Sequence, residues 1–201
     1  HQALIADGGR VAFDARALQS PAFGTRGIGR FAKAALEGTR QAVGDGLLTL
    51  IVDEGLRELP VELAGECEQR TRIHGDDVWQ FSVLIQPSPM THSPEPLIPL
   101  LHSTAYSLAV VFDFIPWHFP TVYLNNPAAR AEYGANLDAL RLYSDFTCIS
   151  DTARQELVEF LAQGDRLVEA DSVSVAWPHN VFDSRWVKSS SSRDSSEGPI
   201  V

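Results

Sequence analysis

The sequence contains only two cysteines, Cys67 and Cys148, among its 201 residues. Two thiols in a chain of this length do not make the disulfide framework of a small secreted domain. Cys148 lies in an apolar stretch with the character of a buried strand, so we interpret it as a small core residue. A reducing, cytoplasmic compartment fits this cysteine usage best.

Long apolar runs are also lacking. The longest, residues 108–115, is interrupted by Asp113 and is too short to cross a bilayer. The start of the chain has no basic region followed by a long apolar stretch, so we expect no signal peptide. Peripheral contact of a loop with a membrane and self-association into a homodimer both stay open.

Basic residues are outnumbered, with 16 Lys and Arg against 26 Asp and Glu and a net charge of −10. A phosphate backbone would be repelled by that average charge, so we expect no nucleic-acid partner. A local basic pocket for a small phosphate group is still compatible with the negative net charge.

Several motifs of well-known chemistry are absent. The sequence has no Gly-x-Ser-x-Gly elbow and no P-loop lysine motif, which argues against an α/β-hydrolase or a P-loop NTPase. No histidine has a partner at the spacing of a zinc site, so we expect no metal. This holds for His74, His92, His102, His118 and His179.

Apolar runs of strand length alternate with segments of helical periodicity, which predicts an α/β fold with a Rossmann-like, open, mainly parallel sheet and helices on both faces. We expect residues 1–188 to form one domain and the serine-rich residues 189–201 to be a flexible tail or linker. Residues 54–67 are expected to be a helix or a helix with a loop. The predicted strands are 11–14, 47–52, 81–85, 107–114, 146–149 and 173–175, and the main helices are 30–43, 98–102, one starting at 126–127, and 152–161.

The first candidate site is the glycine-rich turn 24–29, between the first predicted strand and helix. Backbone N–H groups and the helix dipole favour an anion at such a turn. Gly27 and Gly29 would allow a ligand to approach the backbone, and Arg26 and Arg30 could bind a phosphate. The order is not that of the dinucleotide fingerprint. A tight turn without a ligand is an equally weighted alternative.

The second candidate is Asp113, near the end of the clearest predicted strand. Ligands of open α/β sheets bind beyond the carboxyl ends of the strands, so this carboxylate could act as a base or accept hydrogen bonds from sugar hydroxyls. Trp117 and Phe119 could form a stacking platform, and His118 lies near the same expected cleft. The alternative is that Asp113 caps a turn and the aromatic residues belong to the core.

A third candidate, Ser150, follows another predicted strand as part of Ser-Asp-Thr. All three residue types are good helix N-caps, and capping is the favoured interpretation. Thr152 and Gln155 have the spacing of a capping box. Binding at this helix start stays open.

Three segments together resemble a known family. Residues 13–16 with 27–31, FDAR and GIGRF, resemble the opening strand and glycine loop of group-1 (family 4) glycosyltransferases. Residues 111–123 resemble their HDxIPxxFPxxY segment, and residues 148–154 resemble their strand-to-helix turn with the pattern SxxTR. The order and separations of the segments fit over residues 11–180.

The resemblance implies the N-terminal, acceptor-side half of a GT-B enzyme with two facing Rossmann-like domains. Such an enzyme transfers a hexose from a nucleotide-sugar to a glycan or lipid-linked acceptor, as in polysaccharide biosynthesis, with retention and without a metal ion or cofactor. It implies Asp113 as the catalytic candidate. The implied substrate-binding residues are Gly27, Gly29, Arg30, Arg26, Trp117, His118 and Ser150.

Two features depart from the family pattern. Phe112 replaces the family's histidine, and nothing matches the E-x7-E segment of the donor-binding domain. We therefore expect the donor domain to be absent from this chain and the chain alone to be nearly inactive. The alternatives are a non-catalytic module that binds a glycan or a partner protein, and a GT-B-type sugar-nucleotide epimerase.

Overall fold

The computed structural model describes residues 9–163 and 172–175. The predicted tail 189–201, the domain boundary at residue 188 and His179 lie outside the described residues.

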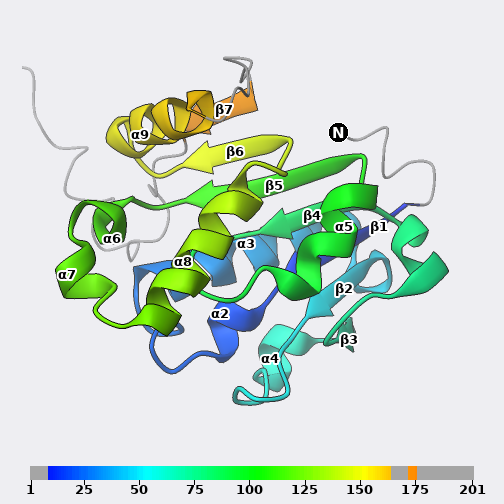
Figure 1. Ribbon diagram of the computed structural model, residues 1–201. Helices are drawn as coiled ribbons and strands as arrows, with labels where there is room; N and C mark the ends of the chain where they lie inside the picture. The colour runs from blue at the N-terminus through cyan, green and yellow to red at the C-terminus, as the bar shows by residue number, and fades with distance from the viewer. Residues whose placement is uncertain (1–8, 164–171, 176–201) are drawn as a thin grey trace, which may run out of the picture.

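The described residues form an α/β fold around one seven-stranded sheet in which every neighbouring pair of strands is parallel (Figure 1). The strand order is β3-β2-β1-β4-β5-β6-β7, so the chain starts in the middle of the sheet and extends first to one edge and then to the other. The predicted Rossmann-like open sheet is confirmed. The strands are β1 (Arg10–Asp14), β2 (Leu48–Ile51), β3 (Glu68–Arg70), β4 (Phe81–Gln86), β5 (Tyr106–Val111), β6 (Asp145–Cys148) and β7 (Val173–Val175).

Helices pack on both faces of the sheet. Buried residues of α3 and α4 share a core cluster with β1 and β2, whereas buried residues of α5, α8 and α9 belong to a second cluster with β4, β5 and β6. The helices are α2 (Arg16–Gln19), α3 (Gly27–Val43), α4 (Val61–Ala64), α5 (Ile98–Ser103), α6 (Ile115–His118), α7 (Pro120–Tyr123), α8 (Pro127–Leu140) and α9 (Asp151–Ala162), with 3-10 turns η1 (Asp45–Leu47), η2 (Gly75–Gln80) and η3 (Glu95–Leu97).

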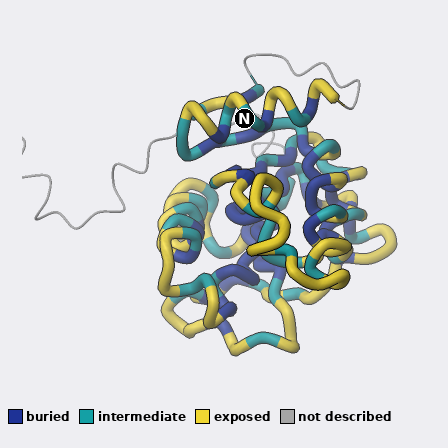
Figure 2. Tube along the Cα trace, turned by 60° about the vertical axis from the view of Figure 1, so that its left-hand side comes forward, coloured by how far each residue is buried: buried dark blue, intermediate teal, exposed yellow. Residues whose placement is uncertain are grey.

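Alternation along the central strands divides the core. In β1, Val11 and Phe13 face the α3 side, while Ala12 faces the α5 and α8 side. Both sets are buried because a parallel strand between two helical layers has no solvent face. Figure 2 shows the buried stretches in the middle of the molecule and the exposed turns outside it.

The structure departs from the sequence predictions at two strands. β3 was not predicted, because its charged residues lack an apolar pattern. It lies at the sheet edge, where Glu68 accepts hydrogen bonds from Arg10 and Arg70 at 2.5 and 2.7 Å, and charge at an edge opposes further pairing. β5 ends at Val111, before the predicted 114, because Asp113 accepts a hydrogen bond from the backbone of Ile115 and so forms a turn before α6.

Two predicted helix starts shift. α3 begins at Gly27 instead of residue 30, so two glycines of the turn lie inside its first turn. α9 begins at Asp151 with Ser150 as its N-cap, so the expected capping box at Thr152 is wrong. No helix among residues 9–163 and 172–175 is both long enough and apolar enough to cross a membrane.

Candidate functional site

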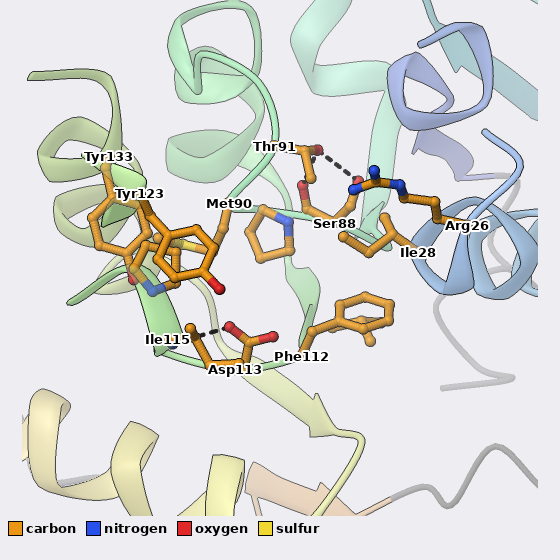
Figure 3. A pocket seen from close by; sticks show the side chains of 13 residues that line it. Arg26, Ile28, Ser88, Met90, Thr91, Phe112, Asp113, Ile115, Tyr123 and Tyr133 are labelled. Atoms are coloured by element: carbon orange, nitrogen blue, oxygen red, sulfur yellow. Dashed lines mark hydrogen bonds between the residues drawn. The ribbon is translucent and has the colours of Figure 1, made fainter. Parts of the chain in front are cut away.

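A pocket of about 290 Å³ lies at the carboxyl edge of the sheet, between the glycine turn and the end of β5 (Figure 3). Arg26 and Ile28 approach it from the start of α3, and Asp113 lies across it. The two sequence-predicted candidates therefore share one crevice. The pocket is lined by Arg26, Ile28, Ser88, Pro89, Met90, Thr91, Val110, Phe112, Asp113, Ile115, Pro116, Tyr123 and Tyr133.

The two predicted glycines have different roles. Gly29 is buried, and a Cβ there would overlap the backbone of Gly24, so this glycine is required for the turn to pack on α3. Its N–H donates to the carbonyl of Phe23 at 3.2 Å. Gly27 is exposed and has open space where a Cβ would lie. Neither glycine lines the pocket. The structure therefore does not support the expected close approach of a ligand to the backbone at Gly27 or Gly29.

The first turn of α3 presents positive potential at the pocket. Arg26 occupies the N-cap position, and no side chain caps the helix. No side chain therefore neutralises the partial positive charge of this helix start, although the carbonyl of Phe23 accepts the N–H of Gly29. Arg30 lies one turn further along; it is exposed and is not among the pocket residues.

Asp113 both caps the turn that precedes α6 and faces the pocket. Its Oδ1 accepts the N–H of Ile115 at 3.0 Å, as the capping alternative predicted. The carboxylate nevertheless lines the pocket, and in Figure 3 the ring of Tyr123 reaches toward it from α7. One hydrogen bond leaves acceptor capacity on both carboxylate oxygens. Asp113 can therefore cap its turn and still accept a hydrogen bond from a ligand hydroxyl.

Tyr133 of α8 carries a polar group with unused bonding capacity. Its hydroxyl oxygen is buried and has no hydrogen-bond partner among the described residues. The nearby N–H of Trp117 donates instead to the carbonyl of Phe114 at 2.9 Å. Burial first, and then the negative charge of Asp113, raise the pKa of Tyr133 to about 12. The hydroxyl is thus protonated and able to donate at neutral pH.

Hydroxyl groups from the loop after β4 form another wall. Ser88 is buried, and Thr91 Oγ1 donates to its carbonyl at 2.9 Å. Thr91 Oγ1 also lies 2.8 Å from Nδ1 of His92. Burial lowers the pKa of His92, with Arg16 adding to the effect while Asp14 opposes it. A neutral His92 can accept or donate in this chain of hydroxyls.

Trp117 and His118 are not brought into the same pocket. They line a separate hollow of about 130 Å³ between α6 and α9. There, His118 Nε2 lies 2.8 Å from Glu156 Oε1. The α6 helix turns these two side chains away from the side that Ile115 and Pro116 present to the pocket.

Ser150 caps α9, as the favoured interpretation predicted. Its side-chain oxygen accepts the N–H of Ala153 at 3.1 Å. Ser150 is not among the residues that line the pocket.

A buried polar network lies beside the pocket and fixes the edge of the sheet. The carboxylate of Asp14, at the end of β1, accepts from Arg16 at 2.8 and 2.9 Å and from Gln86 at 2.9 Å. Arg16 also donates to the carbonyl of Ser93 at 2.7 Å, and the Tyr143 hydroxyl donates to Gln86 Oε1. Burial alone would raise the pKa of Asp14, but Arg16 outweighs it and holds the pKa below its usual value.

Sequence reasoning missed the tyrosine and the loop hydroxyls of the pocket. In the sequence, Tyr133 falls on the apolar face of a helical pattern, and Ser88 and Thr91 fall in a proline-rich stretch that indicates only a loop. Ser88 and Thr91 follow a predicted strand, and all parallel strands end at the same edge of the sheet. That position could have indicated that these two hydroxyls lie at the ligand-binding edge. Among the described residues, no group of three or more His, Cys, Asp or Glu could hold a metal ion.

No known family model, curated protein or solved structure matches this chain. The pocket joins a cationic end at Arg26, a carboxylate at Asp113, a phenol donor at Tyr133 and apolar walls. Such a site can hold a small polyhydroxylated ligand, with donors and acceptors fixing its orientation.

Proposed function

We propose that this chain is the acceptor-side domain of a glycosyltransferase that transfers a hexose from a nucleotide-sugar to a glycan or lipid-linked acceptor. The observation that carries the proposal is that the α3 turn and Asp113 line the same pocket. It lies where open α/β sheets bind their ligands. The resemblance of the glycine loop and of residues 111–123 supplies the reaction class.

The size of the pocket favours an acceptor sugar over a whole nucleotide-sugar. Pockets for small molecules span about 300–1,000 Å³, and this one, at about 290 Å³, is at the lower limit. A single sugar ring could place one hydroxyl on Asp113 and another on Tyr133. The donor would then be bound mainly by a second domain, with stabilisation of the leaving diphosphate as the main catalytic contribution.

Within the proposed reaction, Asp113 orients or deprotonates the acceptor hydroxyl, and the cationic start of α3 faces the donor phosphates. The proposed enzyme uses no metal and no cofactor, with the nucleotide-sugar as its substrate. The chain without a donor domain would be nearly inactive, because half of the transition-state contacts would be missing.

One observation favours the alternative of a non-catalytic binding module. Phe112 packs edge-on against Phe31, with ring centroids 5.6 Å apart, where the family pattern has a histidine. That position therefore offers an apolar contact in place of a polar group. A module of this kind would bind a glycan without transferring it.

The test joins the chain to the donor-binding half of a characterised family enzyme and assays transfer from a panel of nucleotide-sugars. We expect transfer by the fusion, a loss of about 100-fold or more in Asp113→Asn, and no loss in Asp138→Asn, an exposed control on α8. A folded fusion that binds saccharides without transferring them would support the module. Robust turnover by the 201-residue chain alone would contradict the acceptor-half proposal.

A further inference from the structure

The side chains that line the pocket divide it into a polar side and an apolar side. On the polar side, Tyr123 reaches toward Asp113, and Tyr133 lies next to Tyr123 (Figure 3). Asp113 accepts the N–H of Ile115 and keeps further acceptor capacity on its carboxylate. The hydroxyl groups of a ligand can therefore be bound on this side.

Ile28 and Phe112 form the opposite side, which we call the apolar wall. Ile28 belongs to the first turn of α3, and Phe112 directly follows β5. Both side chains are half-buried, so part of their carbon surface is free to contact a ligand. The ring of Phe112 packs edge-on against the ring of Phe31, with centroids 5.6 Å apart. The apolar wall is therefore fixed by the packing between α3 and the end of β5.

The polar groups of the remaining lining do not need a ligand beside the apolar wall. Thr91 Oγ1 donates to the carbonyl of Ser88 at 2.9 Å, and it lies 2.8 Å from Nδ1 of His92. Arg26 is exposed, so water can solvate its guanidinium. Of the residues that line the pocket, only Tyr133 has a buried side-chain polar atom without a partner, and it lies on the polar side.

This division has a consequence for the sugar that the pocket can take. A hexose that binds Asp113 through its ring hydroxyls turns its other edge toward Ile28 and Phe112. A hydroxymethyl group at that edge would lose its water contacts without gaining a partner, which lowers affinity about tenfold. A methyl group there would instead cover the carbon surface of the wall. An acetamido group would bring an N–H and a carbonyl to a wall that pairs with neither.

We propose that the pocket selects a 6-deoxyhexose, with its ring hydroxyls on Asp113 and its C6 methyl group against Ile28 and Phe112. The inference rests on the proposed function, because it names the class of acceptor sugar that this site takes. Its test measures binding and not transfer. A fusion that transfers no sugar would therefore leave the preference intact, whereas a preference for a hydroxymethyl group would leave the proposed transfer intact.

The test is titration of the isotopically labelled 201-residue chain with three matched pairs of sugars, followed by the amide signals of Ile28 and Asp113. The pairs are L-rhamnose with L-mannose, L-fucose with L-galactose, and D-fucose with D-galactose. The two members of each pair differ only in the oxygen on C6, so the ratio of their affinities isolates the contact at that carbon.

Two variants make the apolar wall polar, and each has a matched control outside the pocket. Phe112→His is compared with Phe119→His, because Phe119 is 57% exposed and does not line the pocket. Ile28→Thr is compared with Val158→Thr, an exposed position on α9. Circular dichroism and thermal unfolding verify the fold of each variant. The second variant keeps the test decisive if Phe112→His does not fold.

We expect the tightest sugar to be a 6-deoxy member that binds about tenfold more tightly than its partner. Phe112→His and Ile28→Thr should each lower this ratio about threefold or more, while both controls keep it. Equal affinities within all three pairs, or tighter binding of the hydroxymethyl member, would overturn the proposal. So would an unchanged ratio in both wall variants, an equal loss in the controls, or no binding of any of the six sugars at saturating concentration.

Discussion

The ring of Phe31 meets the ring of Phe112 edge-on, with centroids 5.6 Å apart and planes 82° from each other. The contact joins α3 to the residue next to Asp113, so it holds together the two sides of the pocket. An edge-to-face pair adds about 0.5–1.5 kcal/mol beyond the burial of its area. We expect a double-mutant cycle of Phe31→Leu and Phe112→Leu, followed by urea unfolding, to give a coupling energy in that range. Strictly additive single effects would show that the contact does not brace the pocket.

The glycines of the turn give a matched pair. Gly29→Ala should destabilise the protein by about 2 kcal/mol or more, because its Cβ would meet the backbone of Gly24. Gly27→Ala has open space and a helical position, so it should be neutral or stabilise by up to about 1 kcal/mol. Thermal unfolding of both variants checks this. Equal effects would argue against a packing role for Gly29.

Tyr133→Phe removes a buried hydroxyl that has no partner in the described structure. We expect unchanged or higher stability, by up to about 1 kcal/mol, together with weaker saccharide binding. Tyr143→Phe is the contrast, because its hydroxyl donates to the buried Gln86, and its loss should cost about 1–3 kcal/mol. Urea unfolding and calorimetric titration measure the two effects. A destabilised Tyr133→Phe would indicate that its hydroxyl already has a structural partner.

The buried Asp14–Arg16 pair should contribute far more than an exposed pair. Asp14→Ala leaves the Arg16 guanidinium buried without its carboxylate and should cost about 3–5 kcal/mol. Glu95→Ala breaks the exposed contact with Arg72 and should cost less than about 1 kcal/mol. Chemical unfolding of both variants gives the comparison. A small cost at Asp14 would show that Gln86 and solvent can replace the pair.

Stability should fall as the pH drops below about 6.5 because of His92. Burial, the largest cause, lowers the pKa of His92 in the folded protein below its usual 6.5, so the unfolded chain binds the proton first. Its contribution is fully present above pH 6.5 and is lost as the pH falls toward the lower folded pKa. Melting temperatures between pH 7.5 and 5.5 should therefore decrease less in His92→Gln than in the parent chain. An equal decrease of the melting temperature in the variant and the parent chain would show that other titratable groups cause the loss of stability.

Much of the fold could be predicted from the sequence because buried parallel strands leave continuous apolar runs. Such runs located β1, β2, β4 and β6 to within a residue or two. β3 was not predicted because an edge strand needs no apolar pattern. Its Glu68 and Arg70 are stabilised by ion pairs instead. The short helices α6 and α7 were not predicted because four residues are too few to show a helical periodicity of apolar residues.

The candidate site was predicted in part. Parallel strands must end at one edge, so the sequence could bring Arg26 and Asp113 to the same side of the sheet, and the pocket joins them. The order of the strands does not predict the direction in which side chains of a short helix point. For this reason Trp117 and His118 were expected in the cleft, whereas α6 turns them toward Glu156. Tyr133 is also recognisable only once its hydroxyl is seen buried beside Asp113.

Titration of the isotopically labelled chain with a panel of hexoses and disaccharides, followed by the backbone amide signals of Ile28 and Asp113, tests the shared pocket most directly. These residues lie on opposite sides of the pocket and are far apart in sequence. We predict that one saccharide shifts both signals along a single binding curve, and that Asp113→Asn weakens that curve while Asp138→Asn does not. Two unrelated curves, or no shift at either residue with any saccharide at saturating concentration, would contradict the account.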